Sequence, residues 1–404
     1  MDIKVIAEKI HKNGGRLYLV GGAVRNLLLG ITPKDYDYCV TGLTADEFLE
    51  IFPNAFLRGK DFPVFDLNNT EFALARKEHK STIGHTGFKI DTNKSITIED
   101  DLKRRDLTIN SIAMDVLTEK IIDPFNGKKD IDNKLIKATS NAFNEDPLRV
   151  YRAARFSAEY DFEIDSDTLV LMTSLRDELH TLSAERVFAE FRKALCSKKP
   201  SQFFIALKNC NCLDIHFKEI YNLIGIEQPL KYHPEGDVFN HTMEVIERAA
   251  QQSDDELIRF AALVHDFGKI ATPKNILPHH YNHENNGDAF VVEFCKHLKL
   301  PNDYKKVGLT SCKEHMLAGK YNELKYSTKV DFLSRISKTL LGIKGLEIIA
   351  NSDKKREIKI EFASIGEKMI KEINGKTVDI KNLDYHKAKD KIRQARIDWL
   401  KQNS

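Results

Sequence analysis

The hydrophobic and polar positions of the chain change their pattern near residue 100. In the first part, short β-rich runs alternate with segments of helical spacing. Residues 16–20 (RLYLV) predict a strand that ends at Gly21-Gly22, and residues 23–30 follow with the spacing of a helix. Residues 35–40 (DYDYCV) predict a second strand, because polar and apolar side chains alternate between its two faces.

The rest of this first part predicts one more helix, two more strands and a loop. Residues 44–52 have the spacing of a helix with a capping box at its start. Residues 62–67 and 71–78 are typical of strands joined by a turn. Residues 79–98 are rich in Gly, Ser, Thr and Lys and lack a sustained period, so we expect a mobile loop there.

From about residue 100 the apolar positions have helical spacing that continues to the C-terminus. Amphipathic segments follow one another and are interrupted by a Pro- and His-rich loop at residues 273–287. A Lys-rich tail begins near residue 351 and ends in a long charged helix at about 383–402. The pattern therefore predicts a small α/β head followed by a helical body.

Composition limits the classes of protein that fit this pattern. The 404 residues include 62 Lys+Arg and 60 Asp+Glu, and the net charge of +2 excludes a polybasic arm or an acidic tail as the dominant feature. No apolar run approaches the roughly 18 residues of a membrane span. Residues 1–15 also lack the apolar core of a signal peptide. Six scattered cysteines without a CxxC pair predict reduced, mostly buried thiols and a cytoplasmic location.

Two carboxylates and a glycine turn in the head indicate phosphate chemistry. Asp35 and Asp37 are two residues apart on a predicted strand and therefore share a face. Close carboxylates repel one another unless a cation lies between them, and oxygen ligands suit Mg²⁺. Gly21-Gly22 allows the backbone to approach phosphates, and Arg25 adds a bidentate contact. A lone DxD is more often a solvated turn. The prediction of a metal and phosphate site therefore depends on the combination of the two aspartates with Gly21-Gly22 and Arg25.

A row of charged residues occupies a predicted helix after the head. Its members follow one another at intervals of three and lie along one side of the helix: Asp146, Arg149, Arg152 and Arg155. One interpretation is a surface ion pair beside a solvated face. The other is that the first two residues offer donors and an acceptor to a nucleobase, while the remaining arginines face its phosphates.

The segments that carry these residues resemble one family, in the order that the family has. Class II tRNA nucleotidyltransferases, the CCA-adding enzymes of the polymerase-β nucleotidyltransferase superfamily, contain blocks similar to LVGGAVRNLLLG, KDYDYCV, EFALARKE, EDDLKRRDLTINSIAMD and NEDPLRVYRAARF. The similarity covers the first 160 residues almost continuously. It implies an α+β head of the polymerase-β nucleotidyltransferase type, a mostly α-helical neck and body, and template-independent addition of CCA to tRNA 3′ ends.

The resemblance assigns catalytic roles to residues of the head. Gly22 and Arg25 match the nucleotide-binding turn of the family. Asp35 and Asp37 match its catalytic pair, which binds Mg²⁺. Glu71 stands where a third, supporting carboxylate lies.

The resemblance also assigns nucleotide recognition. Arg105 matches an arginine that contacts the nucleotide, and Asp106 matches an aspartate that supports ribose recognition. Asp146 and Arg149 match the pair that recognises the Watson–Crick edge of CTP or ATP. The same helix carries two further matches to nucleotide-contacting arginines, Arg152 and Arg155.

A second set of polar residues lies in the helical body. His265 and Asp266 follow an apolar helical run, where both are costly to bury without partners. With His241 and Asp353 they suit a divalent metal site, and their order resembles the HD phosphohydrolase superfamily. An HD domain occurs in one subset of bacterial CCA-adding enzymes, often called multifunctional CCA proteins. The resemblance implies these four ligands, a transition metal such as Ni²⁺ or else Mg²⁺, and phosphatase and 2′,3′-cyclic phosphodiesterase activity.

Other histidines keep alternatives open in this region. His233 competes with His241 for the first ligand position. The histidines of the Pro- and His-rich loop either bind phosphate or lie at the surface without a role: His279, His280 and His283.

These assignments predict four parts of the chain. They are a head at residues 1–138, a helical neck and body at 139–236, an all-α HD domain at 237–340 and a Lys-rich helical tail at 341–404. The expected partners are CTP, ATP and the acceptor and TΨC arms of tRNA, which would be held through phosphate contacts. We expect no membrane association and a monomer or homodimer.

Three rival functions remain at this point. A bacterial poly(A) polymerase shares the head, but such enzymes typically carry a strongly basic C-terminal extension and lack an HD domain. Here residues 351–404 carry a charge of only +5. An enzyme that adds only CC or only A is the second rival, and a catalytically silent RNA-binding scaffold is the third. Intact Asp35, Asp37 and Arg149 argue against the scaffold.

Overall fold

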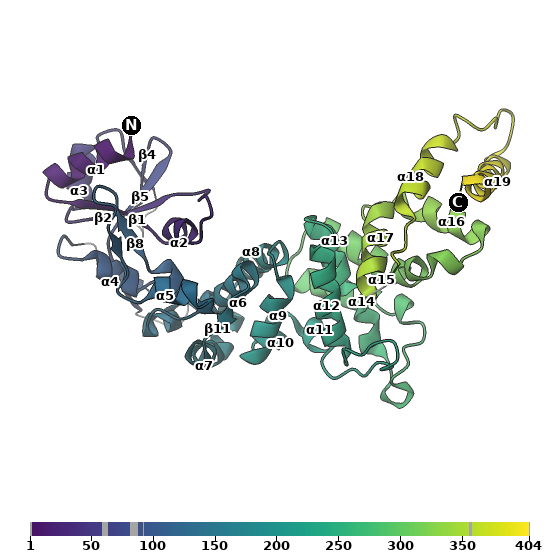
Figure 1. Cartoon of the computed structure of the whole chain (residues 1–404), viewed down its shortest axis with the longest axis horizontal. Coiled ribbons are helices and arrows are strands. Elements are labelled where there is room, and N and C mark those ends of the chain that lie inside the picture. The colour runs from purple at the N-terminus through teal and green to yellow at the C-terminus, as the bar shows by residue number, and fades with distance from the viewer. Residues whose placement is uncertain (1, 59–63, 81–87, 92, 355–357, 404) are drawn as a thin grey trace. The chain divides into compact units, whose positions relative to one another are not determined.

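The chain folds into two compact units, and each has its own architecture. The computed structural model describes residues 2–58, 64–80, 88–91, 93–354 and 358–403 (Figure 1). One unit comprises Met1–Leu182 with Asn209–Cys212, and the other comprises Ser183–Lys208 with Leu213–Ser404. The finer division at residues 138, 236 and 340 stays a prediction.

A mixed sheet forms the centre of the first unit. Among the described residues it has seven strands in the order β3-β4-β5-β2-β1-β8-β9. These strands are β1 Arg16–Val20, β2 Asp37–Thr41, β3 Phe56–Arg58, β4 Val64–Leu67, β5 Thr70–Leu74, β8 Ala113–Asp115 and β9 Ile121–Ile122. β2 pairs antiparallel with β1 and places Asp37 opposite Val20. The sheet therefore brings the DxD segment beside the glycine turn that follows β1.

Helices cover both faces of this sheet. The helices of the first unit are α1 Ile3–Lys12, α2 Gly22–Leu28, α3 Ala45–Ile51, α4 Ile98–Lys103, α5 Gly127–Asp132, α6 Leu148–Tyr160 and α7 Ser166–Ser174, with 3₁₀ turns η1 Thr108–Asn110, η2 Asn141–Glu145 and η3 Arg176–Thr181. Leu17 of β1 packs with α1 and α3, whereas its neighbour Tyr18 packs with α4 on the other face. The predicted capping box of α3 is confirmed, because Glu47 accepts from the Thr44 amide at 2.9 Å and Thr44 accepts from the Glu47 amide.

The prediction of continuous helix after residue 100 is wrong for the end of the head. Strands β8 and β9 follow α4, and a separate parallel pair joins β10 Leu135–Ile136 to β11 Glu163–Ile164. Ala113 is fully buried opposite Val20 of β1. A short apolar run fits a buried strand as well as a helix, and the open edge of β1 supplies the backbone partners that decide between them.

Part of the segment that the sequence predicted as a mobile loop, residues 79–98, forms strands. β6 Lys77–Lys80 and β7 Phe88–Asp91 pair antiparallel, and α4 begins at Ile98. Of the predicted loop, residues 81–87 and 92 lie outside the described residues. The same holds for residues 62 and 63 of the predicted strand 62–67, whose remainder is β4. The described residues 79–80 and 88–91 of the segment therefore belong to a strand pair, and residues 93–97 lead into α4.

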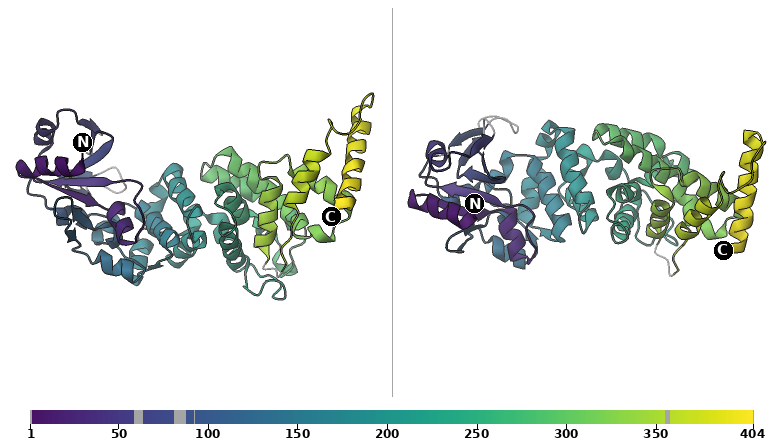
Figure 2. Two further views of the ribbon diagram at one scale, coloured as in Figure 1. Left: turned by 45° about the horizontal axis from the view of Figure 1, so that its top comes forward. Right: turned by 90° about the horizontal axis from the view of Figure 1, so that it is seen from above.

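The second unit consists of helices and the loops between them, with one isolated β-bridge between Glu227 and Asp237 among its described residues. Figure 2 shows the sheet in the purple and blue N-terminal part and helices from teal to yellow. The helices of this unit are α8 Ala184–Leu195, α9 Pro200–Asn209, α10 Leu213–His216, α11 Lys218–Tyr221, α12 Val238–Ala250, α13 Glu256–Val264, α14 Asp288–His297, α15 Asn302–Gly319, α16 Tyr326–Ile336, α17 Gly342–Asp353, α18 Ala363–Glu372 and α19 Tyr385–Asn403, with 3₁₀ turns η4 Phe267–Ala271, η5 Lys274–Ile276, η6 His283–Asn285 and η7 Tyr321–Glu323. α12, α13, α15 and α17 pack against one another around an apolar core.

Two further expectations concern the whole chain. In the part of the chain that the structure describes, we find no helix that is both long and apolar enough to span a bilayer. The six cysteines are free thiols, and all except Cys196 are buried, as the sequence predicted.

Candidate functional sites

A glycine turn joins β1 to α2 and brings an arginine close to the backbone. Gly21 adopts φ 67°, a conformation that side chains other than glycine rarely tolerate. A Cβ atom at Gly21 would lie 2.8 Å from Nη1 of Arg105. The positive φ thus explains the glycine of the predicted turn, and the flexible end of the Arg105 side chain lies close to it.

The carboxylates that the sequence predicted as metal ligands lie at the start of β2, next to this turn. Asp37 is the first residue of β2, whereas Asp35 precedes the strand, so the prediction that both lie on one strand is wrong for Asp35. Both side chains are exposed, and neither has an ion-pair partner among the described residues. Asp37 and Glu71 line a pocket of about 210 Å³ together with Arg105. Exposed carboxylate oxygens beside a pocket fit a hard divalent cation.

A buried carboxylate holds the arginines of the RRD segment. Asp101 is 1% exposed and accepts from Nε of Arg104 at 3.0 Å and from Nη2 of Arg105 at 3.0 Å. Burial alone would raise the pKa of Asp101, but the two guanidinium groups reverse this and lower it. We did not single out Asp101 from the sequence. Its spacing to Arg104 and Arg105, three and four residues along a helix, is the signal that could have identified it.

Asp106 ties the head to α6. Its carboxylate accepts from Nε and Nη2 of Arg152, both at 2.7 Å, and from Nδ2 of Asn110 at 3.1 Å. Burial opposes the charge of Asp106, yet Arg152, Asn110 and Arg149 lower its pKa to about 2. The predicted ribose-recognising aspartate and one predicted nucleotide-contacting arginine therefore bind each other in this structure.

We expect Asp106→Asn to lower the free energy of unfolding by about 2–3 kcal/mol at pH 7, because the pKa of Asp106 lies about two units below that of an unfolded aspartate. The difference from the wild type should be full above about pH 4 and shrink as the pH falls towards 2, where the carboxylate of the folded wild type becomes protonated. Urea unfolding at several pH values measures this. The exposed Asp132→Asn is the matched control, and an equal loss at pH 3 and pH 7 would refute the ion-pair explanation.

The predicted base-recognising pair lies where α6 begins. Asp146 accepts from the Leu148 amide at 3.0 Å. Arg149 donates from Nη1 to the Ala142 carbonyl at 2.6 Å and from Nη2 to the Arg104 carbonyl at 2.8 Å. These two bonds fix the plane of the guanidinium and leave its other N–H groups for a ligand.

Two predicted phosphate-binding arginines are engaged by protein groups. Arg25 is 6% exposed, bonds to Asn110 and lies 5.0 Å from the ring centre of Phe156 on α6. Arg155 is also 6% exposed and pairs with Glu159. Because a cation held over an aromatic ring stabilises the contact between elements, Arg25 joins α2 to α6 here. Direct contacts of Arg25 and Arg155 with nucleotide stay predictions.

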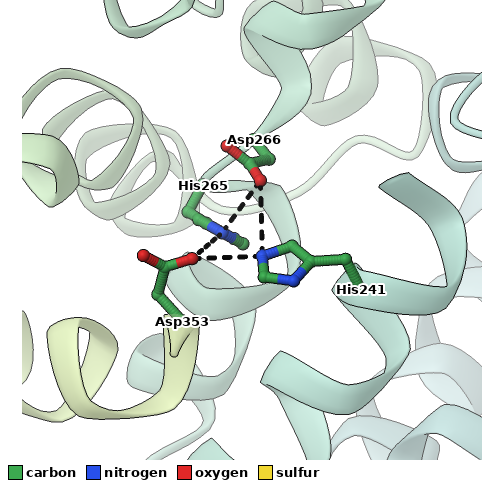
Figure 3. A group of neighbouring side chains, drawn as sticks. All are labelled: His241, His265, Asp266 and Asp353. Atoms are coloured by element: carbon green, nitrogen blue, oxygen red, sulfur yellow. Dashed lines mark hydrogen bonds and ion pairs between the residues drawn. The ribbon is translucent and has the colours of Figure 1, made fainter. Parts of the chain in front are cut away.

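Four predicted ligands of the second site converge in the core of the helical unit (Figure 3). His241 comes from α12, His265 and Asp266 follow α13, and Asp353 ends α17. Nε2 of His241 lies 3.1 Å from Oδ1 of Asp353 and 3.5 Å from Oδ2 of Asp266. Nε2 of His265 lies 3.6 Å and 3.3 Å from the same two atoms. One atom from each residue therefore lies within 4.8 Å of the others, which is the arrangement of a metal centre.

Hydrogen bonds fix the tautomers of both imidazoles. Nδ1 of His265 lies 2.7 Å from the Ala262 carbonyl, and Nδ1 of His241 lies 2.6 Å from Oε1 of Glu235. A carbonyl or carboxylate oxygen only accepts, so each Nδ1 is a donor and each Nε2 is the nitrogen that binds a cation once it carries no proton. Nε2 of His265 has no hydrogen-bond partner among the described residues. Both Nε2 atoms thus face the position that a cation would occupy.

The carboxylates give this cluster a negative potential. Burial disfavours the imidazolium of His265, but Asp266 and Asp353 overcome it and raise the pKa of His265 to about 10. Lys269 places Nζ 2.7 Å from Oδ2 of Asp266 and donates to Gln228 at 2.7 Å. The cluster thus attracts positive charge, which a divalent ion supplies when bound.

The four other histidines that the sequence singled out have different contacts. His233 bonds to Glu235 at 3.1 Å, and hydrogen bonds from His241 and His233 outweigh burial to lower the pKa of Glu235 to about 2. His233 therefore supports the carboxylate that orients His241, and His241 is the ring that reaches the cluster. His280 bonds to Thr272 and to the Glu227 carbonyl. The other two loop histidines have different contacts. His279 stacks on a tyrosine, and His283 approaches the carboxylate of Asp266.

Family models match most of the chain. Residues 17–137 match the poly A polymerase head domain, residues 161–223 match the probable RNA and SrmB- binding site of polymerase A, and residues 238–336 match the HD domain. The proteins named multifunctional CCA protein from Shewanella denitrificans and Haemophilus influenzae are each 44% identical to the chain. The match covers 79% of this chain in both cases and 78% and 79% of the relatives.

Solved structures share the fold. A CCA-adding enzyme in apo form I has a TM-score of 0.64 at 19% identity, over 99% of this chain and 91% of that one. The Thermotoga maritima CCA-adding enzyme complexed with tRNA has a TM-score of 0.63 at 18% identity, over 99% and 92%. At these identities the likeness concerns the fold.

Proposed function

Since the chain belongs to the family of multifunctional CCA proteins, we propose that its first unit adds CCA to tRNA 3′ ends and that its His–Asp cluster hydrolyses phosphate esters. The observation that carries the proposal is the presence of both sites in one chain. A poly(A) polymerase would share the head, but that activity would not explain the buried His–Asp cluster. RNA and nucleotide binding follow from the family, whereas CTP and the acceptor and TΨC arms of tRNA are our specific proposals.

Asp35 and Asp37 are the proposed ligands of Mg²⁺ in the head. When bound, the ion neutralises charge on the triphosphate and activates the tRNA 3′-hydroxyl for in-line attack on the α-phosphate. The protein's own contribution is position. Asp101 holds Arg105 over the glycine turn, where the guanidinium faces the pocket that Asp37 lines. Preorganised donors of this kind stabilise developing charge without reorganisation in the transition state.

Asp146 and Arg149 are the proposed selectors of the incoming base. The guanidinium of Arg149 is fixed by two carbonyls, so its remaining donors keep one direction. A donor edge on Arg149 and an acceptor on Asp146 complement cytosine and adenine better than uracil and guanine.

We expect Arg149→Ala and Asp146→Ala each to reduce discrimination of CTP against UTP by about 10- to 100-fold, since one bidentate base contact is worth about 1–3 kcal/mol. Single-nucleotide incorporation kinetics on tRNA measure this. Lys128→Ala, an exposed change in the same unit, is the control. Unchanged selectivity in both variants, with normal incorporation of CTP, would exclude this pair as the selector.

His241, His265, Asp266 and Asp353 are the proposed ligands of a divalent metal at the second site. The buried lone pairs of both imidazoles fit a transition metal such as Ni²⁺, and the two carboxylates also admit Mg²⁺. The ion supplies Lewis-acid activation when bound. Glu235 keeps His241 in the ligating tautomer, and Lys269, whose Nζ lies 2.7 Å from Oδ2 of Asp266, is the cation that we propose for the phosphate of a substrate. We propose 2′,3′-cyclic phosphodiesters and phosphate monoesters as substrates.

A further inference from the structure

One edge of the His–Asp cluster is more open to solvent than the rest. Asp353 is 9% exposed, whereas His241, His265 and Asp266 are each at most 2% exposed. The phosphate of a substrate therefore reaches the cluster most directly from the side of Asp353. Side chains that lie on this side are the candidates for contacts with the rest of the substrate.

An exposed aromatic ring lies at this edge. Tyr232 is 60% exposed. The next residue, His233, places its ring centre 4.7 Å from that of His241. Lys354 directly follows Asp353, and its Nζ lies 5.8 Å from the centre of the Tyr232 ring. Contacts from two separate segments thus place Tyr232 beside the open edge of the cluster.

Two lysines flank this ring. Nζ of Lys231 lies 5.4 Å and Nζ of Lys354 lies 5.8 Å from the ring centre of Tyr232. Both lysines are exposed, and neither has an ion-pair partner among the described residues. A flexible lysine can leave the ring when a flat group stacks on it. An aromatic face beside two such cations therefore suits a nucleobase that is linked to phosphate.

Backbone hydrogen bonds hold both segments that carry these groups. The amide of Tyr232 donates to the Pro229 carbonyl at 2.9 Å and closes a turn. Arg248 on α12 donates from Nε to the Ser352 carbonyl at 2.5 Å and from Nη2 to the Asp353 carbonyl at 3.4 Å. The turn and the end of α17 are therefore fixed, so the ring has a defined place next to the cluster.

We propose that Tyr232 is a specificity-determining residue of the His–Asp cluster and that its ring stacks on the base of a nucleotide whose ribose phosphate lies in the cluster. The inference rests on the proposed hydrolysis of phosphate esters at this site and narrows its substrates to nucleotides. Every base has a π-face, so stacking selects nucleotides over other phosphate esters without selecting one base. A free nucleotide and the 3′ end of an RNA chain share this chemistry. Only the RNA chain brings a further phosphate, which Lys231 and Lys354 would contact.

The first test compares two substrates that differ only in the base. We would measure kcat/KM of the full-length chain for 2′,3′-cyclic AMP and for ribose 2′,3′-cyclic phosphate. Tyr232→Ala should lower kcat/KM for 2′,3′-cyclic AMP by about 5- to 100-fold and leave that for the ribose compound unchanged. Tyr232→Phe keeps the ring and should match the wild type, as should Tyr385→Ala, which changes an exposed tyrosine of the same unit. Equal losses for both substrates, or no loss for either, would overturn the proposal.

A binding measurement makes the inference independent of hydrolysis. The chain has one tryptophan, so the Tyr232→Trp/Trp399→Phe variant carries its single indole at the proposed stacking position. We expect 2′,3′-cyclic AMP to quench the fluorescence of this indole and ribose 2′,3′-cyclic phosphate to leave it unchanged. Quenching without hydrolysis in the wild type would refute the hydrolytic function and support the stacking. Absence of quenching by 2′,3′-cyclic AMP would refute the stacking.

A further comparison distinguishes the two sources of the nucleotide. An oligoribonucleotide that ends in a 2′,3′-cyclic phosphate is compared with 2′,3′-cyclic AMP in the Lys231→Ala/Lys354→Ala variant. A loss of kcat/KM confined to the oligonucleotide would identify the RNA 3′ end, and wild-type values for both would identify the free nucleotide. Either result agrees with stacking on Tyr232. A Tyr232→Ala variant that cleaves the oligonucleotide and 2′,3′-cyclic AMP at wild-type rates would contradict it.

Discussion

Asp37→Ala is expected to lower the rate of nucleotide addition by about a thousand-fold, because losing a metal ligand removes several kcal/mol of transition-state stabilisation. Asp37 is exposed at the start of β2, so the substitution leaves no buried group without a partner. Folding should therefore be unchanged. Incorporation of labelled CTP into tRNA measures the loss.

Hydrolysis of 2′,3′-cyclic AMP by the same preparation provides the internal control for Asp37→Ala. That activity belongs to the other unit and should keep its wild-type rate. Asp46→Asn changes an exposed carboxylate on α3 and should leave both activities intact. If Asp37→Ala retained more than a tenth of the wild-type addition rate, the assignment of Asp37 as a metal ligand would be wrong.

His265→Ala is expected to abolish metal-dependent hydrolysis of 2′,3′-cyclic AMP and to preserve nucleotide addition. The ring is buried and places Nε2 between Asp266 and Asp353. Removing it deletes a ligand and leaves two buried carboxylates with one fewer cationic partner, which costs about 3–5 kcal/mol. We expect a loss of hydrolysis of about a thousand-fold, measured with Ni²⁺ or Mn²⁺ added.

Two comparisons make the result for His265→Ala interpretable. Wild-type rates of nucleotide addition would show that the first unit is folded, and a cooperative thermal unfolding transition of the helical unit would show the same for the unit that contains His265. His297→Ala removes an exposed imidazole from α14 in the same unit and should hydrolyse at the wild-type rate. Unchanged hydrolysis by His265→Ala would remove His265 from the metal site.

Local signals in the sequence were sufficient for some features and insufficient for others. The capping box of α3 and the glycine at the end of β1 depend on neighbouring residues, and both were predictable. The short strand β8 was not predictable from its own residues, because pairing with the edge of β1 decides its conformation. Asp101 lies three and four residues before Arg104 and Arg105, a spacing that indicates ion pairs on a helix, but its burial depends on tertiary packing that no local spacing predicts.

The second site depends on contacts between distant parts of the chain. His241 and Asp353 are 112 residues apart, and no spacing rule brings them together, so the sequence pointed to them through a family resemblance. His315 lies in the second half of α15, and its polar neighbours Lys313 and Glu314 do not distinguish it from an ordinary residue of an amphipathic helix. Its position beside His283 follows only from the packing of η6 against α15, which the sequence does not encode as a local pattern.

The most direct test of the account uses purified chain and tRNA that ends at the discriminator base, with labelled CTP and ATP supplied singly and together. The account predicts that CTP alone extends the tRNA by two residues. Both nucleotides together should give one defined product ending in CCA, after which extension stops. Processive addition of A to unrelated RNA, or addition of A without prior C, would contradict it.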